Sequence, residues 1–247
     1  MLIKTKGIIF KAIKYSETSL IVDIYTEEKG LRKYIISGVR SKKGKTKASL
    51  LQVMSLVELV AYEREDRDLN RIKEIQAAYV FQSVPFRLQK GAIGLFMAEV
   101  ARKTIKEAAP NKDLFEFLWN SFIFLDETGE SIANIHLQFL IDLSAFLGFI
   151  PGGMYCQETP LFDLQEGLFT HKIPSHPHYL EESYSQLVYQ LIETRLNNCH
   201  QIAITRQQRQ HLIGHLLDYY RLHMENFPSI HSHQILQEVL GGTNSGK

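Results

Sequence analysis

The sequence predicts an α+β protein in which a small barrel or sandwich of short strands, residues 1–82, precedes a helical domain, residues 83–247. Short runs of β-branched residues fill the first eighty positions, whereas apolar residues recur at helical spacing after Pro85. Charge changes along the chain as well. Residues 1–50 carry twelve Lys/Arg and four acids, net +8, although the whole chain is only +1. A basic N-terminal part before an acidic remainder indicates two halves with different tasks, the first directed at a polyanion.

Four segments of the N-terminal part have the composition of strands, and a fifth is ambiguous. Polar or charged turns separate the four, which are residues 6–13, 19–28, 31–39 and 53–63. In the fifth, residues 71–81, Ile72 and Ile75 have helical spacing with Leu69, while Tyr79 and Phe81 alternate.

Three apolar stripes then predict three helices that pack on one another. They comprise Ile93, Phe96, Met97, Val100 and Ala101; Phe115, Leu118, Trp119, Phe122 and Leu125; and Ile132, Ile135, Phe139, Leu143 and Phe146. Residues 151–179 hold four of the seven prolines and predict an irregular insert with a small hairpin. Helices resume over 182–196 and 205–224, with a short one over 232–240 and a disordered tail at 241–247.

Composition indicates a globular protein of a reducing compartment. Its two cysteines, Cys156 and Cys199, are far apart and form no paired motif, which suits the cytoplasm. The N-terminus has no apolar signal core, and no run approaches the roughly 18 apolar residues of a membrane span. We therefore expect a cytoplasmic protein without a membrane partner.

The segment GVRSKKGKTK, residues 38–47, is the strongest candidate for contact with nucleic acid. It is a basic loop that contains five cations and no acid: Arg40, Lys42, Lys43, Lys45 and Lys47. A lysine-rich loop can also be simply solvated or protect a sheet edge. Arg32, Lys33 and Tyr34 precede this loop, and barrel proteins that bind single strands combine cations for phosphates with rings for bases. Rings are available at Tyr15, Tyr25, Tyr34 and Tyr62, although core packing explains each equally well.

No segment predicts catalysis, and no cofactor is expected. The sequence lacks a P-loop, a dinucleotide-binding glycine motif and a G-x-S-x-G elbow. The ten histidines include the pairs His211/His215, His176/His178 and His231/His233, which have spacings that metal ligands use. The helical pair lacks the acid of H-E-x-x-H, so surface histidines are favoured over a metal-dependent hydrolase.

Several short motifs occur in an order that resembles the RecO recombination-mediator proteins of bacteria. They are Gly7-Ile8-Ile9, the Tyr15–Ser19 turn, the step from Tyr25 to Gly30, and Gly38-Val39-Arg40 before the basic loop. Farther on, FLIDLSAFLGFIPGG, residues 139–153, is similar to the family's helix that ends in L-G-[FY]-x-P.

The resemblance implies a five-stranded OB-fold barrel, with residues 71–81 as its fifth strand, followed by an all-helical domain. It implies a DNA repair protein without catalysis that binds single- and double-stranded DNA, anneals strands and assists recombinase loading. The implied partners are RecR and the acidic tail of single-strand-binding protein. The alternative is an RNA-binding OB-fold module on a helical scaffold, because the basic loop does not discriminate between the two phosphate backbones.

Two further expectations concern the helical domain. Some family members carry a four-cysteine zinc module after the L-G-[FY]-x-P helix, but here that region contains Cys156 alone, so no structural zinc is expected. Leu161, Phe162, Leu164, Leu168 and Phe169 are instead expected to hold the insert together. A basic patch on the first helix, Arg102, Lys103 and Lys106, is the candidate site for an acidic partner peptide, with a solvated helix face as the simpler alternative.

Overall fold

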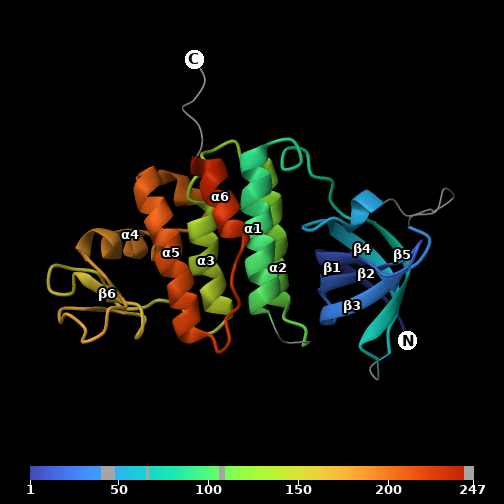
Figure 1. Ribbon diagram of the computed structural model, residues 1–247, viewed down its shortest axis with the longest axis horizontal. Helices are drawn as coiled ribbons and strands as arrows, with labels where there is room; N and C mark the ends of the chain where they lie inside the picture. Colours follow the sequence, from blue (N-terminus) through green and yellow to red (C-terminus); the bar gives the residue numbers. More distant parts are fainter. Residues whose placement is uncertain (40–47, 65–66, 106–108, 242–247) are drawn as a thin grey trace, which may run out of the picture. The chain divides into compact units, whose positions relative to one another are not determined.

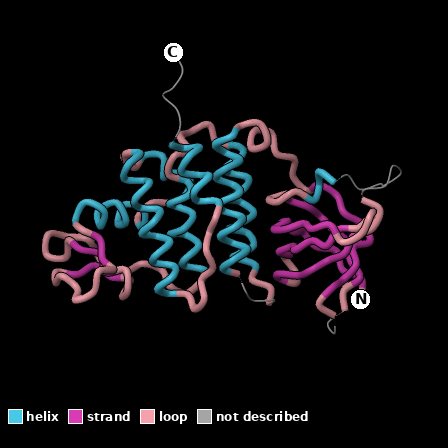
Figure 2. The backbone as a smooth tube through the Cα atoms, in the orientation of Figure 1, coloured by secondary structure: helices cyan, strands magenta, loops and turns pink. Residues whose placement is uncertain are grey.

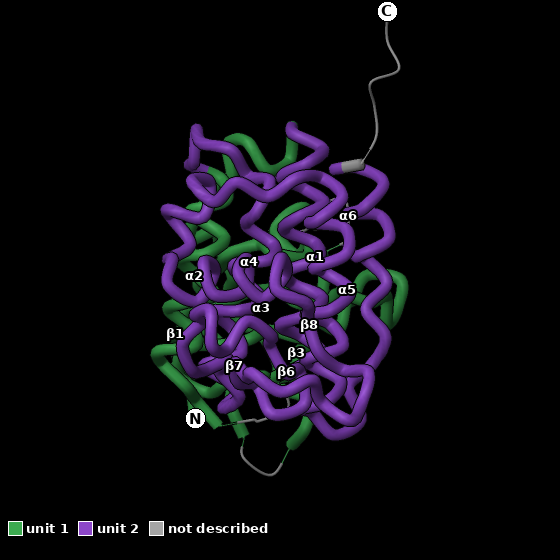
Figure 3. Tube along the Cα trace, turned by 90° about the vertical axis from the view of Figure 1, so that its left-hand side faces the viewer, with its two compact units in different colours: residues 1–86, 105–126 green, residues 87–104, 127–247 purple. Residues whose placement is uncertain are grey.

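The computed structural model describes residues 1–39, 48–64, 67–105 and 109–241 (Figure 1). Its contacts divide the chain into two compact units (Figure 3). Unit 1 consists of Met1–Phe86 with Ile105–Asp126, and unit 2 consists of Arg87–Thr104 with Glu127–Lys247. Strands dominate unit 1 and helices dominate unit 2 (Figure 2). The α+β fold class is therefore confirmed.

Unit 1 contains a closed barrel with the strand order β1-β2-β3-β5-β4. The strands are β1 (Leu2–Lys14), β2 (Leu20–Thr26), β3 (Gly30–Ile36), β4 (Leu56–Tyr62) and β5 (Leu69–Ala77), and the short helix η1 (Ala48–Leu51) precedes β4. The ambiguous fifth segment is thus a strand from Leu69 to Ala77, whereas residues 78–81 of the expected strand lie outside it. It pairs with β4 along most of its length and joins β3 in parallel, so pairing within the barrel overrides its mixed periodicity.

The long strand β1 makes closure possible because it pairs with two partners. Its first half pairs with β4 and its second half with β2, with a register shift between Ile9 and Lys11. Gly7 pairs with both neighbours at this crossover, and a Cβ there would lie 2.5 Å from Cγ2 of Ile24. Only glycine allows so close an approach without displacing the packed core.

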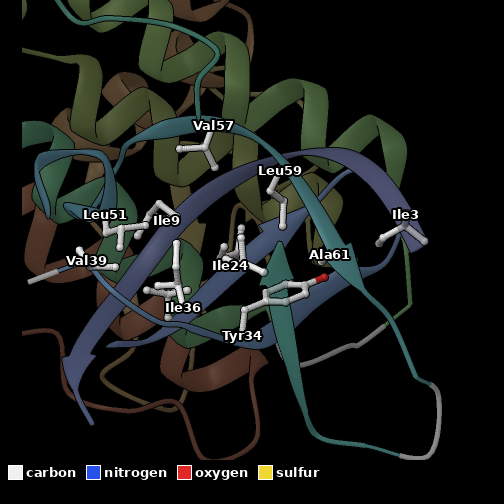
Figure 4. Packing of buried hydrophobic residues seen from close by; sticks show 12 residues of the cluster. Ile3, Ile9, Ile24, Tyr34, Ile36, Val39, Leu51, Val57, Leu59 and Ala61 are labelled. Carbon is white, nitrogen blue, oxygen red and sulfur yellow. The ribbon is translucent and has the colours of Figure 1, made fainter. Parts of the chain in front are cut away.

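Alternate residues of the strands fill the barrel interior. Figure 4 shows the ring of Tyr34 lying among the aliphatic side chains of this core. The buried cluster comprises Ile3, Ile9, Val22, Ile24, Tyr34, Ile36, Val39, Leu51, Val57, Leu59, Ala61 and Ile72. Val39 and Leu51 belong to it, so the chain is anchored in the core on both sides of the basic loop.

Helix α2 (Lys112–Glu127) belongs to the same unit as the barrel, whereas the first and third helices, which pack on each other as expected, belong to unit 2. Phe115 packs on Tyr25 of β2 with ring centroids 6.0 Å apart. The ammonium group of Lys6 lies over the Trp119 ring, 5.6 Å from its centroid, in a cation–π contact. At the end of this helix the Asp126 carboxylate accepts hydrogen bonds from the backbone N–H groups of three consecutive residues, Gln82, Ser83 and Val84. The stretch after β5 is thereby fixed to α2.

Unit 2 is a helical bundle in which α3 contacts α1, α4 and α5, and α6 packs mainly on α1. The helices are α1 (Leu88–Thr104), α3 (Ile135–Phe146), α4 (Glu182–Ile192), η2 (Leu196–Gln201), α5 (Arg206–His223) and α6 (Ser232–Gly241). Among the described residues, no helix has the length and apolar character needed to cross a bilayer.

The insert forms a three-stranded sheet with the order β7-β6-β8, which extends the expected hairpin by one short strand. Its strands are β6 (Leu161–Asp163), β7 (Leu168–Thr170) and β8 (Tyr179–Leu180). Phe162, Leu164 and Phe169 are buried as expected, whereas Leu168 is 49% exposed and lies outside the core of the insert.

Candidate nucleic-acid interface

A row of aliphatic side chains runs across the outer wall of the barrel. Ile13, Ile21 and Ile35 are direct cross-strand neighbours on β1, β2 and β3. Arg71 of β5 continues the row beside Ile35, and Tyr62 of β4 lies opposite Arg71. Residues paired in this way project from the same face of a sheet. Ile13 is 45% exposed and Tyr62 is 49% exposed, so the row is accessible within unit 1.

Two lysines flank this row farther along the strands. Lys11 and Lys33 are exposed and lie on either side of Asp23 in the register of β1, β2 and β3. Within the described residues, neither lysine forms an ion pair with Asp23 or with another acid. We call the surface made by Lys11, Ile13, Ile21, Lys33, Ile35, Tyr62 and Arg71 the cationic face.

Cations on the β1–β4–β5 wall of the barrel behave differently. Lys4 lies 2.8 Å from the Glu58 carboxylate, which also accepts a hydrogen bond from Gln76 at 2.7 Å. The hydrogen bond from Lys4 is the main cause of the lowered pKa of Glu58. Lys73 lies 3.4 Å from Glu74. Acids already neutralise this wall, whereas the cations of the cationic face remain available for an external anion.

Of the three residues singled out on β3, only Lys33 lies on the cationic face. Tyr34 is fully buried, and its hydroxyl donates to Oε2 of Glu63 at 3.2 Å. Burial, followed by the neighbouring Glu63 charge, raises the pKa of this phenol. Arg32 lies 3.3 Å from the other oxygen of Glu63, itself only 5% exposed. The suggested contact of Tyr34 with a base is therefore corrected. Side chains alternate along β3, so the Tyr34 ring points into the barrel interior, and Arg32, on the same face of the strand, reaches Glu63.

The four candidate tyrosines divide into two groups. Tyr25 and Tyr34 are buried, and Tyr25 stacks on Phe10 with ring planes 8° apart. Tyr15 and Tyr62 are 62% and 49% exposed and are the rings of this set that remain accessible in unit 1.

Sequence reasoning missed Lys11 and Arg71 as site residues. Their alternation with the buried residues of β1 and β5 was the available signal. The strand register was nevertheless needed to bring them together, because β1 and β5 are far apart along the chain.

Most of the basic loop lies outside the described residues. This applies to all five of its cations, Arg40, Lys42, Lys43, Lys45 and Lys47. Their predicted contact with DNA therefore stays a prediction. The described residues place the start of the segment: β3 ends at Ile36, one residue beyond Ile35 of the cationic face, and Gly38 follows with a φ of +79°.

The basic patch on α1 is also only partly described, since Lys106 lies outside the described residues. Lys103 is not available to a partner because its ammonium group lies 2.5 Å from Oε1 of Glu99 and donates to the Ser229 carbonyl. Glu99 also accepts hydrogen bonds from the backbone N–H groups of His231 and Ser232 at the start of α6. Burial alone would raise the pKa of Glu99, but the hydrogen bonds from Lys103 and Ser232 lower it to about 2. Lys103 therefore joins α1 to α6, and Arg102 remains partly exposed.

The histidine pairs have ordinary structural contacts. His211 shares a 2.8 Å hydrogen bond with the Tyr184 hydroxyl, His176 lies 3.3 Å from Asp163, and His233 contacts the Ile230 carbonyl. In the part of the chain that the structure describes, no three His, Cys, Asp or Glu side chains converge as metal ligands would. Cys199 is buried, which raises the pKa of its thiol to about 12.

Comparison with known proteins covers both halves of the chain. The family model described as Recombination protein O N terminal matches residues 1–81, and that described as Recombination protein O C terminal matches residues 85–230. The DNA repair protein RecO of Christiangramia forsetii is 38% identical over 98% of this chain and 100% of its own length. The DNA repair protein RecO of Phocaeicola vulgatus is 35% identical over 97% of this chain and 99% of its own length. The protein of the same name from Porphyromonas gingivalis is 27% identical, with the same two coverages. The closed five-stranded barrel, the helical part and these matches together establish that the chain belongs to the RecO family of DNA repair proteins.

Proposed function

We propose that this RecO protein performs its role in DNA repair and recombination by binding single- and double-stranded DNA on the cationic face. One observation carries the proposal: among the described residues, Lys11, Lys33 and Arg71 surround an exposed aliphatic row with no acid paired to them, whereas Lys4 and Lys73 of the other wall each lie against an acid. Family membership favours this function over the RNA-binding alternative.

The chemistry of the cationic face suits a flexible strand. Ammonium and guanidinium groups neutralise phosphates and release counterions, so binding depends on salt and little on sequence. The aliphatic row and the Tyr62 ring offer a surface on which unstacked bases are removed from water. A duplex presents its phosphates but keeps its bases stacked, so it uses the cations and not the row. We therefore expect the row to favour single strands and the cations to act on both.

Annealing follows from the same arrangement. A surface that neutralises phosphates lowers the repulsion between two strands and leaves the base edges free to pair. The five cations of the basic loop, which follows β3 directly, extend the positive surface in this proposal.

The proposed partners are RecR and the acidic tail of single-strand-binding protein, and the protein is proposed to assist recombinase loading with them. Arg102 and Lys106 are the remaining candidates for the tail, because Lys103 is committed to Glu99.

Two double variants test the cationic face against a control of equal charge. Lys11→Gln with Lys33→Gln removes two unpaired lysines, whereas Lys4→Gln with Lys73→Gln removes two paired ones from the other wall. We expect the first to bind an oligonucleotide about tenfold more weakly at low salt and with a shallower salt dependence. The control should bind within about twofold of wild type, because its lysines are already neutralised.

Annealing of complementary strands coated with single-strand-binding protein, with and without RecR, then tests the wider function. Equal binding by both folded double variants would remove the cationic face from the proposal. Normal DNA binding without any annealing would contradict the proposed activity but leave the binding site in place.

A further inference from the structure

The aliphatic row of the cationic face, Ile13, Ile21 and Ile35, is part of an apolar barrel wall that α2 leaves open. Tyr25 lies four residues beyond Ile21 on β2 and points to the same side of the strand, where Phe115 of α2 packs on it. Tyr25 is 1% exposed, whereas Ile13 is 45% exposed. Because neighbouring strands lie about 4.8 Å apart, the row spans about 10 Å from β1 to β3. It is therefore long enough to contact a few consecutive bases of a single strand.

The three side chains of the row can contact a base only through apolar groups. Arg71 separates them from Tyr62, the nearest ring along the same register. An isoleucine side chain cannot stack on a base as a ring does, and it neither donates nor accepts hydrogen bonds. It makes dispersion contacts and removes apolar surface from water. The row therefore distinguishes bases by their apolar surface and not by their hydrogen-bonding edges.

The lysines of the cationic face bring bases within reach of the row. Lys11 and Lys33 lie two residues from Ile13 and Ile35 on the same strands, which is about 7 Å at the rise of a β-strand. A nucleotide whose phosphate is bound by one of these lysines can therefore place its base on the row. The phosphate contact itself is the same for DNA and RNA, because both backbones carry the same charge.

The C5 methyl group is the feature of a pyrimidine that an aliphatic surface recognises. Thymine carries this methyl group and uracil does not, while their hydrogen-bonding edges are alike. Apolar side chains are the usual protein contacts of the thymine methyl group. Burying one such group contributes about a fourfold gain in affinity.

We propose that the aliphatic row makes the cationic face selective for thymine in single-stranded DNA over uracil in RNA, through burial of the C5 methyl group. This inference rests on the proposed DNA binding by the same face. Ile13, Ile21 and Ile35 contact the methyl group, and the lysines contribute equally to both nucleic acids. The selectivity is modest and adds to binding that otherwise depends little on sequence. It supplies a discrimination between DNA and RNA that cations alone do not provide.

Four single strands of equal length test the proposal on the full chain: oligothymidylate, oligodeoxyuridylate, oligouridylate and its 5-methyl form. They vary the methyl group and the 2′-hydroxyl independently. By fluorescence anisotropy at one salt concentration, each methylated strand should bind at least about fourfold more tightly than its unmethylated counterpart. Removal of the 2′-hydroxyl at constant methylation should change affinity less than twofold. All four should show the same salt dependence, because their phosphate contacts are the same.

Two double variants then assign the preference to the row. Ile13→Thr with Ile35→Thr keeps side chains that suit a strand but shortens the apolar surface, so the preference for the methylated strands should fall below twofold. Ile150→Thr with Ile173→Thr is the matched control, because these exposed isoleucines belong to unit 2, and it should keep the wild-type preference.

The outcomes separate this inference from the proposed function on which it rests. Equal affinity of wild type for oligothymidylate and oligodeoxyuridylate would overturn the inference and leave DNA binding in place. A preference that survives in the folded Ile13→Thr, Ile35→Thr variant would also overturn it. Failure of all four strands to bind would overturn the proposed function and the inference together. The comparison in wild type is decisive even if the row variant does not fold.

Discussion

Asp23 places a carboxylate on the cationic face between Lys11 and Lys33. It is partly exposed and, within the described part of the chain, forms no ion pair with either lysine. Its negative charge repels a phosphate bound to those lysines. Solvent and dissolved salt screen this repulsion only in part, because the charges are separated by less than a Debye length.

We therefore expect Asp23→Asn to increase affinity for single-stranded DNA about two- to fivefold at low salt. The gain should shrink as salt is raised, because screening already weakens the repulsion. A salt titration of both proteins by fluorescence anisotropy checks this. Unchanged affinity at low salt would indicate that phosphates do not approach this part of the barrel.

Asp142 on α3 gives a second prediction, one that concerns stability. Burial raises the pKa of its carboxyl to about 6, although the hydrogen bond donated by Gln138 opposes the shift. The folded protein thus favours the protonated acid. The resulting stabilisation is complete below the pKa of the unfolded chain and is lost as pH rises through about 6.

Asp142→Asn should remove this pH dependence of stability, because the amide of asparagine does not titrate in this range. Relative to wild type, the variant should gain about 2–3 kcal/mol of unfolding free energy between pH 4 and pH 8. Urea unfolding at several pH values measures the difference. The prediction fails if the two proteins show parallel pH profiles.

At the scale of an element, β3 shows how one strand serves two purposes. Tyr34 and Ile36 enter the core, while Lys33 and Ile35 face outward. The strand leads into the basic loop, whose ends are held by the buried Val39 and Leu51. Substitutions between these anchors should leave the barrel intact.

The corresponding prediction concerns Arg40, Lys42, Lys43, Lys45 and Lys47, which lie outside the described residues. Replacing all five with glutamine should weaken DNA binding and reduce the slope of log affinity against log salt by about 0.9 for each phosphate that the loop neutralises. Thermal unfolding serves as the control for folding and should change little. An unchanged slope in a folded variant would exclude the basic loop from the site.

At the scale of the whole molecule, charge separates the two halves of the chain. Residues 1–50 carry +8 and the remaining residues −7, so the helical part is suited to protein contacts rather than to a broad phosphate-binding surface. In the proposed site for the acidic tail, Arg102 is partly exposed, whereas Lys103 is paired with Glu99 and Lys106 lies outside the described residues.

We expect Arg102→Glu with Lys106→Glu to reduce binding of an acidic tail peptide at least tenfold, while affinity for naked DNA changes less than in the basic-loop variant. Lys103 is left intact because its substitution would release Glu99 and the start of α6. Peptide binding and DNA binding are measured separately. Unchanged peptide binding would place the tail elsewhere, and equal decreases in both assays would indicate that DNA also contacts unit 2.

The sequence alone determined the features that local chemistry encodes. Alternation and helical spacing indicated four strands, the main helices and the hairpin in the insert, because side-chain periodicity depends on neighbouring residues. The order of short motifs indicated the RecO family, which the family matches confirmed. The family in turn implied the fifth strand, which mixed periodicity left undecided.

Only the tertiary structure decided which polar residues face outward and which lie together. Tyr34 and Lys33 are adjacent in sequence, yet one fills the core and the other reaches solvent. Lys103 had the sequence pattern of a surface cation, but the segment that leads into α6 brings the Ser229 carbonyl against it and His231 against its partner Glu99. Lys11, Lys33 and Arg71 are far apart along the chain and share a face only through the register of β1, β2, β3 and β5. Contacts between residues distant in sequence follow from strand register and helix packing, which no local pattern specifies.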